Sequence, residues 1–393
     1  MRNRLFALLV ILAIFILPFN AAISISGPKG EEFVIASGQP NQLNPTIWGR
    51  KVSWFQYRLG YWGYTVYFKD LNTGTITALS QSDTHLPFVS DVNKLSLNNK
   101  YCWWTAYSLK NFYNYEIFVY DINQKQEMVF GDDKSQLSNP VIWSEYLFYT
   151  RKSLTLEPSL EIWVKRLNSN DPAKLIYTYD LKANNYSVHS VDNGYAVWTD
   201  QGDLFLYDVN KDKLTRITKT NETEYFPLIQ NGIIYFNKLS YLNWNLVYTI
   251  YAYNIKEETI KKINNKDAYH WQRPSFNPTA NNFIFTQWYQ ENGKNIYALC
   301  LYDPKQDITK EIQKFPAMPV INSQCSSKDY LVWIDNTSGE YQLKFYNYKT
   351  DETFVLNKTI LQESSPRIDG NTIVWNDSRN GNQDIYGFTV KEK

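Results

Sequence analysis

Cysteine is scarce in this sequence, and its scarcity limits how the fold can be held together. The 393 residues include three cysteines, Cys102, Cys300 and Cys325. So few cysteines cannot cross-link a chain of this length, and the odd number leaves at least one thiol unpaired within the chain. Apolar burial must therefore stabilise the core, and the length calls for several modules or a repeat array.

The sequence also lacks an excess of either charge and a recognisable catalytic motif. Its 40 Lys and Arg residues balance 39 Asp and Glu residues, which argues against a nucleic-acid binder that relies on a broad positive field. No Gly-x-Ser-x-Gly nucleophile elbow occurs, and no long window shows the helical periodicity that an α/β-hydrolase domain needs. We therefore predict no catalytic residue, no cofactor and no nucleic-acid partner.

An apolar run at the N-terminus is typical of a targeting segment. Two arginines, Arg2 and Arg4, precede the uninterrupted apolar stretch Leu5–Leu17, and small residues follow it. This layout is that of a secretory signal, although an apolar run of about 20 residues also suits an uncleaved membrane anchor. We predict that residues 1–26 are a signal peptide or N-terminal anchor. Residues 27–393 then form a single domain outside the cytoplasm: periplasmic, secreted or on the cell surface.

Aromatic residues are abundant, at 17% of the chain, and they recur in eight similar units. Seven units begin with a proline that enters a short strand, and the fourth has a histidine in its place. These anchor residues are Pro45, Pro87, Pro140, His189, Pro227, Pro274, Pro319 and Pro366. They lie about 46 residues apart on average, and each unit holds four short strands of alternating pattern, which is the period of a propeller blade.

The last unit, Ser365–Val390, shows the pattern best. Pro366 enters its first strand, Thr372–Trp375 forms the second, and Asp384–Val390 forms the third, with glycine-containing turns between them. We predict an all-β fold, a β-propeller of eight four-stranded blades. Seven blades are the alternative, if the third or fourth unit is misdivided.

A ring of blades must close without leaving an unpaired strand edge. The last unit ends after three strands, and Glu32–Ala36 is a spare strand upstream of the first unit. We predict that this N-terminal strand supplies the outer strand of the last blade and closes the ring.

Two units resemble known propeller families. The sixth, with Pro274–Pro278, Phe283–Phe285 and Asn295–Tyr297, resembles the blades of TolB-like propellers. The eighth, with Ile373–Tyr386, is similar to the propeller repeats of archaeal and bacterial cell-surface proteins. The resemblance implies a non-catalytic scaffold for protein or surface contacts. Eight units exceed the six blades usual for TolB, so the specific partner of TolB is not carried over.

Tyrosine and tryptophan gather in the segments between the second and third strands of several units, which we expect to be loops. Loops of one type lie on one face of a propeller, and large aromatic side chains there suit a contact with a protein or a glycan. The predicted binding residues are Tyr61, Trp62, Tyr64, Phe112, Tyr113, Tyr241, Trp244, Trp288 and Tyr289. The alternative is that these residues extend the strands and pack on neighbouring blades.

Three histidines, His85, His189 and His270, stand at or just before first strands, near the expected central channel. Converging imidazoles can bind a transition metal. No closely spaced ligand pair accompanies them, so we predict exposed or capping histidines and no metal site.

Several aspartates have a structural explanation. Arg379 lies between Asp377 and Asp384 around one turn, which suggests a charge-paired hairpin in preference to a calcium site. Other aspartates end third strands, where Asp commonly hydrogen-bonds the backbone of the following turn. These are Asp70, Asp121, Asp208 and Asp303.

The sequence therefore favours an exported, monomeric, non-enzymatic β-propeller scaffold that binds an envelope or surface protein. A glycan is the other candidate ligand, and membrane contact is expected only through an uncleaved N-terminus. The alternative function is a channel-facing carbohydrate binder or hydrolase, because paired carboxylates from different blades can meet in the channel of a propeller.

Overall fold

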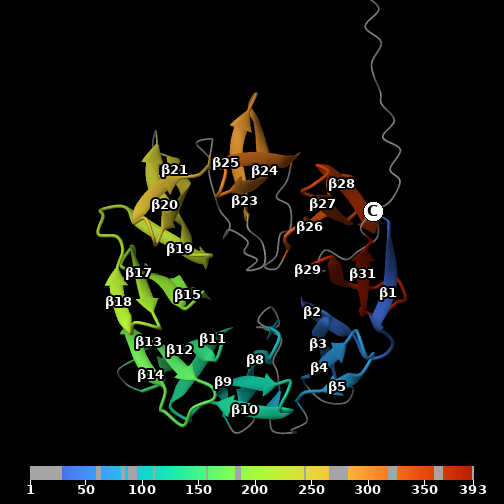
Figure 1. The fold of residues 1–393 in the computed structure, drawn as a ribbon, viewed down its shortest axis with the longest axis horizontal. Coiled ribbons are helices and arrows are strands. Elements are labelled where there is room, and N and C mark those ends of the chain that lie inside the picture. The colour runs from blue at the N-terminus through green and yellow to red at the C-terminus, as the bar shows by residue number, and fades with distance from the viewer. Residues whose placement is uncertain are drawn as a thin grey trace, which may run out of the picture.

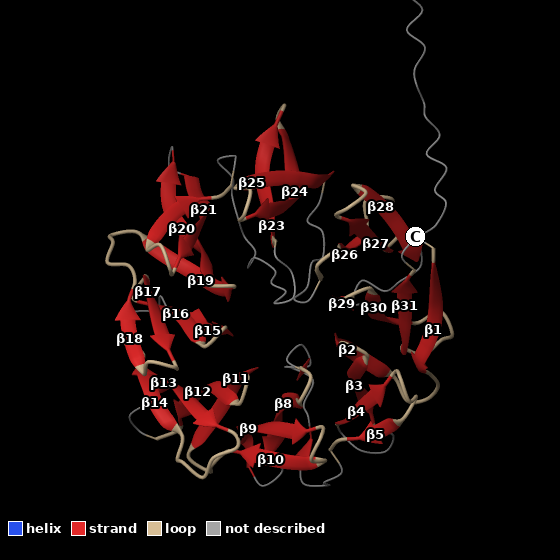
Figure 2. Cartoon of the chain, viewed as in Figure 1, coloured by secondary structure: helices blue, strands red, loops and turns tan. Residues whose placement is uncertain are grey.

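The computed structural model describes the chain from residue 29 to residue 391 with gaps. The described residues are 29–58, 63–80, 85–86, 95–108, 111–155, 158–181, 187–242, 245–264, 282–316, 325–357 and 366–391. They form β-strands and no helix, and the strands build eight sheets arranged in a ring (Figures 1 and 2). None of the described residues forms a helix long and apolar enough to cross a membrane. The predicted signal segment, residues 1–26, lies outside the described residues.

The first four sheets follow the first four predicted units, and we call them blades 1 to 4. Blade 1 comprises β2 (Gln42–Trp48), β3 (Lys51–Tyr57), β4 (Tyr64–Asp70) and β5 (Ile76–Ala78). Blade 2 comprises β6 (His85–Leu86), β7 (Ser96–Leu97), β8 (Tyr101–Ser108), β9 (Asn111–Asp121) and β10 (Gln126–Phe130). Blade 3 comprises β11 (Ser135–Trp143), β12 (Tyr146–Ser153), β13 (Leu160–Arg166) and β14 (Lys174–Thr178). Blade 4 comprises β15 (Ser187–Asp192), β16 (Tyr195–Asp200), β17 (Asp203–Asp208) and β18 (Lys213–Arg216).

The other four sheets are blades 5 to 8. Blade 5 comprises β19 (Thr223–Gln230), β20 (Ile233–Leu242), β21 (Asn245–Asn254) and β22 (Thr259–Lys262). Blade 6 comprises β23 (Phe283–Glu291), β24 (Lys294–Asp303) and β25 (Ile308–Phe315). Blade 7 comprises β26 (Tyr330–Asp335), β27 (Gln342–Asn347) and β28 (Glu352–Asn357). Blade 8 comprises β29 (Arg367–Asp369), β30 (Thr372–Asp377), β31 (Asp384–Val390) and β1 (Gly30–Ala36).

This arrangement confirms the predicted eight-bladed β-propeller. The third and fourth units form separate four-stranded sheets, so the seven-bladed alternative is wrong. In blades 6 and 7 three strands are described. Their expected first strands, around Pro274 and Pro319, lie outside the described residues.

The ring closes as predicted, through pairing of the two ends of the chain. β1 runs antiparallel to β31 from Gly30 opposite Val390 to Val34 opposite Tyr386, with a shift in register before Ala36. A Cβ atom on Gly387 would lie 2.5 Å from the Phe33 ring, so glycine is needed there for the aromatic side chain to cross β31.

Aromatic pairs between the second and third strands form the core of most blades. Trp54, Trp104, Trp198, Trp333 and Trp375 are fully buried in second strands. Four of them stack on the aromatic residue directly opposite on the third strand, with ring centroids 5.6 to 6.1 Å apart. Burying one such side chain stabilises the fold by roughly 3 kcal/mol. The repeat is therefore visible as a stacked aromatic pair in blades 1, 2, 4 and 8, whereas Trp333 of blade 7 lies opposite Lys344.

Hydrophobic and polar contacts join each blade to the next. One apolar cluster combines Phe148 of blade 3 with Trp198 of blade 4. In the same junction the Tyr177 hydroxyl donates a hydrogen bond of 2.9 Å to the buried carboxylate of Asp200. Gln313 of blade 6 donates one of 3.0 Å to buried Asp335 of blade 7. All three cysteines are buried and free, so these contacts hold the ring without disulfides.

The turns between third and fourth strands have the predicted chemistry. Asp70, Asp121, Asp208 and Asp303 each accept hydrogen bonds of 2.8 to 3.2 Å from backbone amides two or three residues further on. Asn254 and Asn347 do the same in blades 5 and 7. Four residues after this cap the backbone has a positive φ, for example 73° at Gly74 and 59° at Asp307. The aspartates are therefore structural, as expected.

Deleting Glu31–Ser37 should lower the melting temperature steeply, because β1 completes blade 8 and buries Ile35 between blades 8 and 1. Ile35 is 2% exposed and Val34 is 48% exposed. Truncation of the buried side chain, Ile35→Ala, should cost about 2–5 kcal/mol, as is usual for a buried isoleucine. Thermal and chemical denaturation of these two variants measures the losses.

The matched control is Val34→Ala, which should change stability by less than about 0.5 kcal/mol. A deletion variant that melts like the full chain, or equal effects at positions 34 and 35, would show that β1 does not close the ring.

Candidate functional site

Two of the predicted aromatic binding residues are buried inside their own blades. Tyr64 of β4 packs edge-on against Phe55 and Tyr57, with ring centroids 6.2 and 5.6 Å away. Tyr289 of β23 is 4% exposed, and its hydroxyl hydrogen-bonds a Glu311 oxygen at 3.2 Å. Both side chains contribute to the packing of a blade.

The other predicted residues lie along hairpins or outside the described residues. Trp288 is half-buried in β23 and stacks on Tyr297 of β24, with ring centroids 6.3 Å apart. Phe112 and Tyr113 belong to β9 and Tyr241 belongs to β20, but their side chains are not described. Three further residues, Tyr61, Trp62 and Trp244, lie outside the described residues.

The aromatic segment of blade 2 is a paired hairpin, where the sequence suggested a loop. Tyr107 of β8 lies directly opposite Tyr115 of β9, and their ring centroids are 4.1 Å apart. A cross-strand pair of this kind stabilises the hairpin. Alternating aromatic residues therefore extend the strands here, because each strand of the pair satisfies the backbone hydrogen bonds of the other.

Of the three histidines, His189 is the one whose side chain is described. His189 lies in β15 and is 5% exposed. Burial lowers the pKa of its imidazole to about 4, so the ring is neutral near pH 7. Within the described part of the chain, no group of three or more His, Cys, Asp or Glu residues is placed to hold a metal ion. His85 lies in β6 without a described side chain, and His270 lies outside the described residues.

The predicted charge-paired hairpin of blade 8 is present, with one different partner. Arg379 forms ion pairs of 2.6 Å with Asp377 on its own blade and with Glu32 on β1. Asp384 does not pair with this arginine; it accepts a hydrogen bond of 3.0 Å from the Gly38 amide. Asp377, through Arg379, and Asp384, through the Gly38 amide, therefore both link blade 8 to the N-terminal segment.

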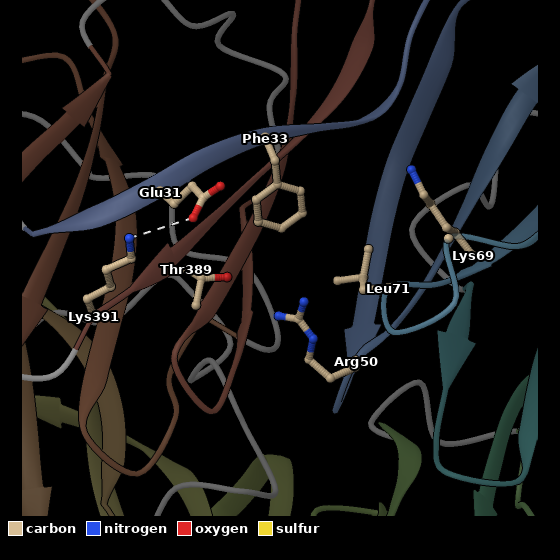
Figure 3. Close-up of a pocket in the computed structure, with 8 residues that line it drawn as sticks. Glu31, Phe33, Arg50, Lys69, Leu71, Thr389 and Lys391 are labelled. Atoms are coloured by element: carbon tan, nitrogen blue, oxygen red, sulfur yellow. Dashed lines mark ion pairs between the residues drawn. The ribbon is translucent and has the colours of Figure 1, made fainter.

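A recess of about 450 Å³ lies at the seam between blades 8 and 1 (Figure 3). We call it the seam recess. β1 contributes Glu31 and Phe33, and the turns of blade 1 contribute Arg50 and Gly74. Lys69 of β4 also lines it. The seam recess therefore joins residues from the two ends of the chain.

The seam recess contains more positive than negative groups. Lys391 lies 3.7 Å from Glu31 in an exposed ion pair at one end. Arg50 points toward the space below Phe33, and Lys69 lies at the end opposite Glu31 (Figure 3). With the residues that the structure describes, neither Arg50 nor Lys69 forms an ion pair. Their hydrogen bonds go to the Thr372 hydroxyl at 3.5 Å and the Ile35 carbonyl at 2.7 Å.

Burial lowers the pKa of the Lys69 ammonium below its usual range. This direction shows that the surroundings of Lys69 provide less stabilisation for a positive charge than water does. A carboxylate brought close to Lys69 would reverse the effect. Together with Arg50, the lysine makes the seam recess suited to an anion.

The lining residues of the seam recess carry no signal within any single repeat, because each is an ordinary surface residue. Alignment of the repeats supplies only a partial signal. Lys69 directly precedes the turn aspartate Asp70, and the same position is Tyr207 in blade 4 and Tyr302 in blade 6. The strand register gives blade 3 a lysine at this position too, Lys165, so Lys69 alone does not distinguish blade 1.

Comparison with known proteins shows the fold and nothing finer. No family model and no curated protein sequence matches the chain. A solved structure of prolyl endopeptidases is similar with a TM-score of 0.54 and 9% identity, over 86% of this chain and 55% of that chain. The WD40 domain of SCAP from fission yeast gives a TM-score of 0.51 and 9% identity, over 92% and 98% of the two chains.

The propeller domain of the Trilobed protease from Pyrococcus furiosus gives a TM-score of 0.49 and 10% identity, over 92% of this chain and 96% of that domain. The chain spans only about half the length of the prolyl endopeptidase. At identities this low, the similarities show a β-propeller, and the activities of those proteins are not carried over.

His189 should make the protein less stable in acid. The unfolded chain binds a proton on this side chain near pH 6.5, whereas the folded protein does so only near pH 4. Stability is therefore lost as pH falls through this window, by a total of roughly 3 kcal/mol. Denaturant unfolding of the protein and of His189→Gln, at pH 7 and pH 4.5, measures the difference.

The quantity to compare is the change in unfolding free energy between the two pH values, because the substitution also alters the packing at both. The variant should lose less stability on acidification than the unaltered protein. Equal losses would mean that His189 is accessible to protons in the folded state.

Proposed function

We propose that this protein is an exported, monomeric, non-enzymatic β-propeller scaffold that binds a protein partner in the cell envelope or at the cell surface. The observation that carries the proposal is the length of certain hairpins between second and third strands. In blade 5, β20 and β21 pair over ten positions, from Ile233 opposite Asn254 to Leu242 opposite Asn245. The same hairpin in blade 4 pairs over six.

Extra strand pairs of this kind are not needed to fill a blade. Blade 4 buries Trp198 and Phe205 with its short hairpin. The long hairpins β20–β21 and β23–β24 project outward at the top of the ring in Figure 1. Ordering the extra residues of a projecting hairpin costs conformational entropy. Contacts with a binding partner can offset this cost.

Aromatic residues occupy the extended parts of the long hairpins. They include Phe112 and Tyr113 in blade 2, Tyr241 in blade 5 and Trp288 in blade 6. Trp288 rests on Tyr297, so its ring is held in place by a neighbour on the same hairpin. Large aromatic side chains on a stiff support supply most of the binding energy in many protein interfaces.

A channel-facing carbohydrate binder or hydrolase is the second candidate function. It is favoured by the structural likeness to prolyl endopeptidases, whose chains are about twice as long as the matched part. The resemblance of two repeats to TolB-like and cell-surface propellers supports the scaffold instead. A hydrolytic activity of the purified chain would decide for the second candidate.

Photo-cross-linking tests whether the long hairpins contact a partner. A photoreactive phenylalanine analogue replaces Phe112, Tyr241 or Trp288 in the cells that make the protein. We expect all three positions to give a covalent adduct with the same envelope or surface protein, identified by mass spectrometry. Each of the three positions lies in a hairpin between a second and a third strand, so the shared adduct tests whether one partner spans the ring.

The matched control positions are exposed apolar residues on outer strands: Val129, Leu214 and Ile308, which are 45%, 44% and 54% exposed. The analogue at these positions should give no such adduct. Equal labelling from hairpin and outer-strand positions, or no protein adduct from any hairpin position, would contradict the proposed contact surface.

Export is tested by the N-terminus of the protein isolated from its own cells. We expect a mature chain that begins between Ala22 and Gly27 and is found outside the cytoplasm, because the segment before it has the layout of a secretory signal. Mass spectrometry of the terminal peptide measures this. An intact Met1 in a membrane fraction would indicate an anchor, and an intact Met1 in the cytoplasm would contradict export.

A further inference from the structure

Three junctions between neighbouring blades share one arrangement of lysine, aspartate and tyrosine. The lysine lies on the outer strand of one blade, and the aspartate lies in the turn between the third and fourth strands of the next blade. The aspartate also accepts a hydrogen bond from a tyrosine hydroxyl on its own third strand. The three sets are Lys174–Asp212–Tyr207, Lys261–Asp307–Tyr302 and Lys310–Asp351–Tyr346.

The strand register identifies the corresponding lysine position at the seam. In each of these blades, a core aromatic residue on the second strand pairs with one residue of the third strand. The next residue along the third strand lies opposite the lysine of the outer strand, which is Lys174, Lys261 or Lys310. In blade 8 that third-strand residue is Gly387, and Phe33 of β1 lies opposite it. Phe33 therefore stands where these three junctions have a lysine. At the remaining junctions the equivalent outer-strand residues are Thr77, Met128, Thr215 and Phe354.

The turn of blade 1 identifies the other two positions. Asp212, Asp307 and Asp351 each lie four residues after the residue that caps the turn, with φ between 51° and 59°. In blade 1 the cap is Asp70, and the fourth residue after it is Gly74, with φ of 73°. The tyrosine of the other blades directly precedes the cap, and in blade 1 this residue is Lys69.

Phenylalanine, glycine and lysine thus replace lysine, aspartate and tyrosine at the seam, and all three residues line the seam recess. A Cβ atom on Gly74 would meet nothing within 4 Å, so the space of the aspartate side chain is open. The lysine of the seam, Lys69, lies on the third strand of blade 1, and Arg50 in the turn between β2 and β3 adds a second cation. At the seam, the turn position that aspartate holds at these three junctions carries no carboxylate.

The protonation behaviour of the lysines agrees with this difference. Hydrogen bonds to Asp351 and Tyr346 raise the pKa of Lys310 at a complete junction. Burial lowers the pKa of Lys69 at the seam. The two lysines therefore differ in the way expected when one has a carboxylate beside it and the other does not.

We propose that the seam recess binds the carboxylate of an acidic side chain from a partner polypeptide. The carboxylate takes the place that Asp212, Asp307 and Asp351 hold at the complete junctions. Lys69 and Arg50 are its cationic partners, and Phe33 packs against its methylene groups.

A polypeptide is the occupant that the structure favours, because the chain itself fills the equivalent spaces with aspartate side chains from turns. A volume of about 450 Å³ accommodates one or two such side chains. The site is distinct from the aromatic hairpins of the proposed function. The turns that line it join first to second strands and third to fourth strands, whereas the hairpin tips join second to third strands at the opposite ends of those strands.

A fluorescent hexaglutamate peptide serves as the probe, with the full chain at low ionic strength and fluorescence anisotropy as the readout. Arg50→Gln and Lys69→Gln should each weaken binding about three- to fivefold, the effect of losing one partly exposed ion pair. The matched control is Lys213→Gln, an exposed outer-strand lysine of blade 4, which should leave binding unchanged.

Gly74→Asp provides an independent test, because it places a carboxylate of the chain itself in the seam recess. Aspartate already occupies this turn position at the three complete junctions with φ of 51° to 59°. The variant should weaken hexaglutamate binding by about tenfold or more, as expected when the site is already filled. It should also melt at a higher temperature than Gly74→Asn, which has the same shape without the charge.

Three results would overturn the proposal. The first is equal weakening by Arg50→Gln and Lys213→Gln, which would indicate general charge attraction. The second is equal binding of hexaglutamate to the unaltered protein and to Gly74→Asp. The third concerns competition for bound hexaglutamate. If inorganic phosphate displaces the peptide at the same concentration as free glutamate does, the seam recess is a site for small anions in general.

Discussion

Pairing between the two ends of the chain is the constraint on which the rest of the structure depends. Before β1 joins β31, blade 8 has a free edge and the apolar faces on both sides of the seam are exposed. Ile35 packs with Ile47 of blade 1 and Val374 of blade 8. One strand therefore completes a sheet and fills the space between two blades. Ring closure and the packing of the first and last blades are for this reason a single event.

The seam differs from the other junctions because of how it is made. In blades 1 to 7 the outer strand follows the third strand along the chain through a short turn. In blade 8 the outer strand comes from the N-terminus, and no such turn links it to β31. The Lys–Asp–Tyr arrangement found at three other junctions is replaced there by Phe33, Gly74 and Lys69. A recess with unpaired cations among the described residues is the consequence, and it is a product of closure.

The ring therefore presents two surfaces of different chemistry. The extended hairpins of blades 2, 5 and 6 carry aromatic residues, and their tips lie at one end of the second and third strands. The seam recess lies at the other end and is cationic. Apolar clusters packed within and between the blades lie between the two surfaces. A scaffold gains specificity when an apolar contact and a charge contact lie at fixed positions relative to each other.

Much of the fold followed from the sequence because its signals are local. The period of the repeats, the turn aspartates such as Asp303 and the spare strand at Glu32–Ala36 depend on near neighbours. The eight sheets, the aspartate turns and the pairing of β1 are present among the described residues. The strand pattern could not show that Tyr64 and Tyr289 are covered, because neighbouring blades bury both faces of a propeller strand. Nor could it show the seam recess, whose residues Phe33 and Gly74 become neighbours only after the ring closes. The sequence by itself determined the strands, their turns and the number of blades, since these depend on local geometry. The tertiary structure decided which side chains are buried and which surround a recess, since that depends on contacts between residues from opposite ends of the chain.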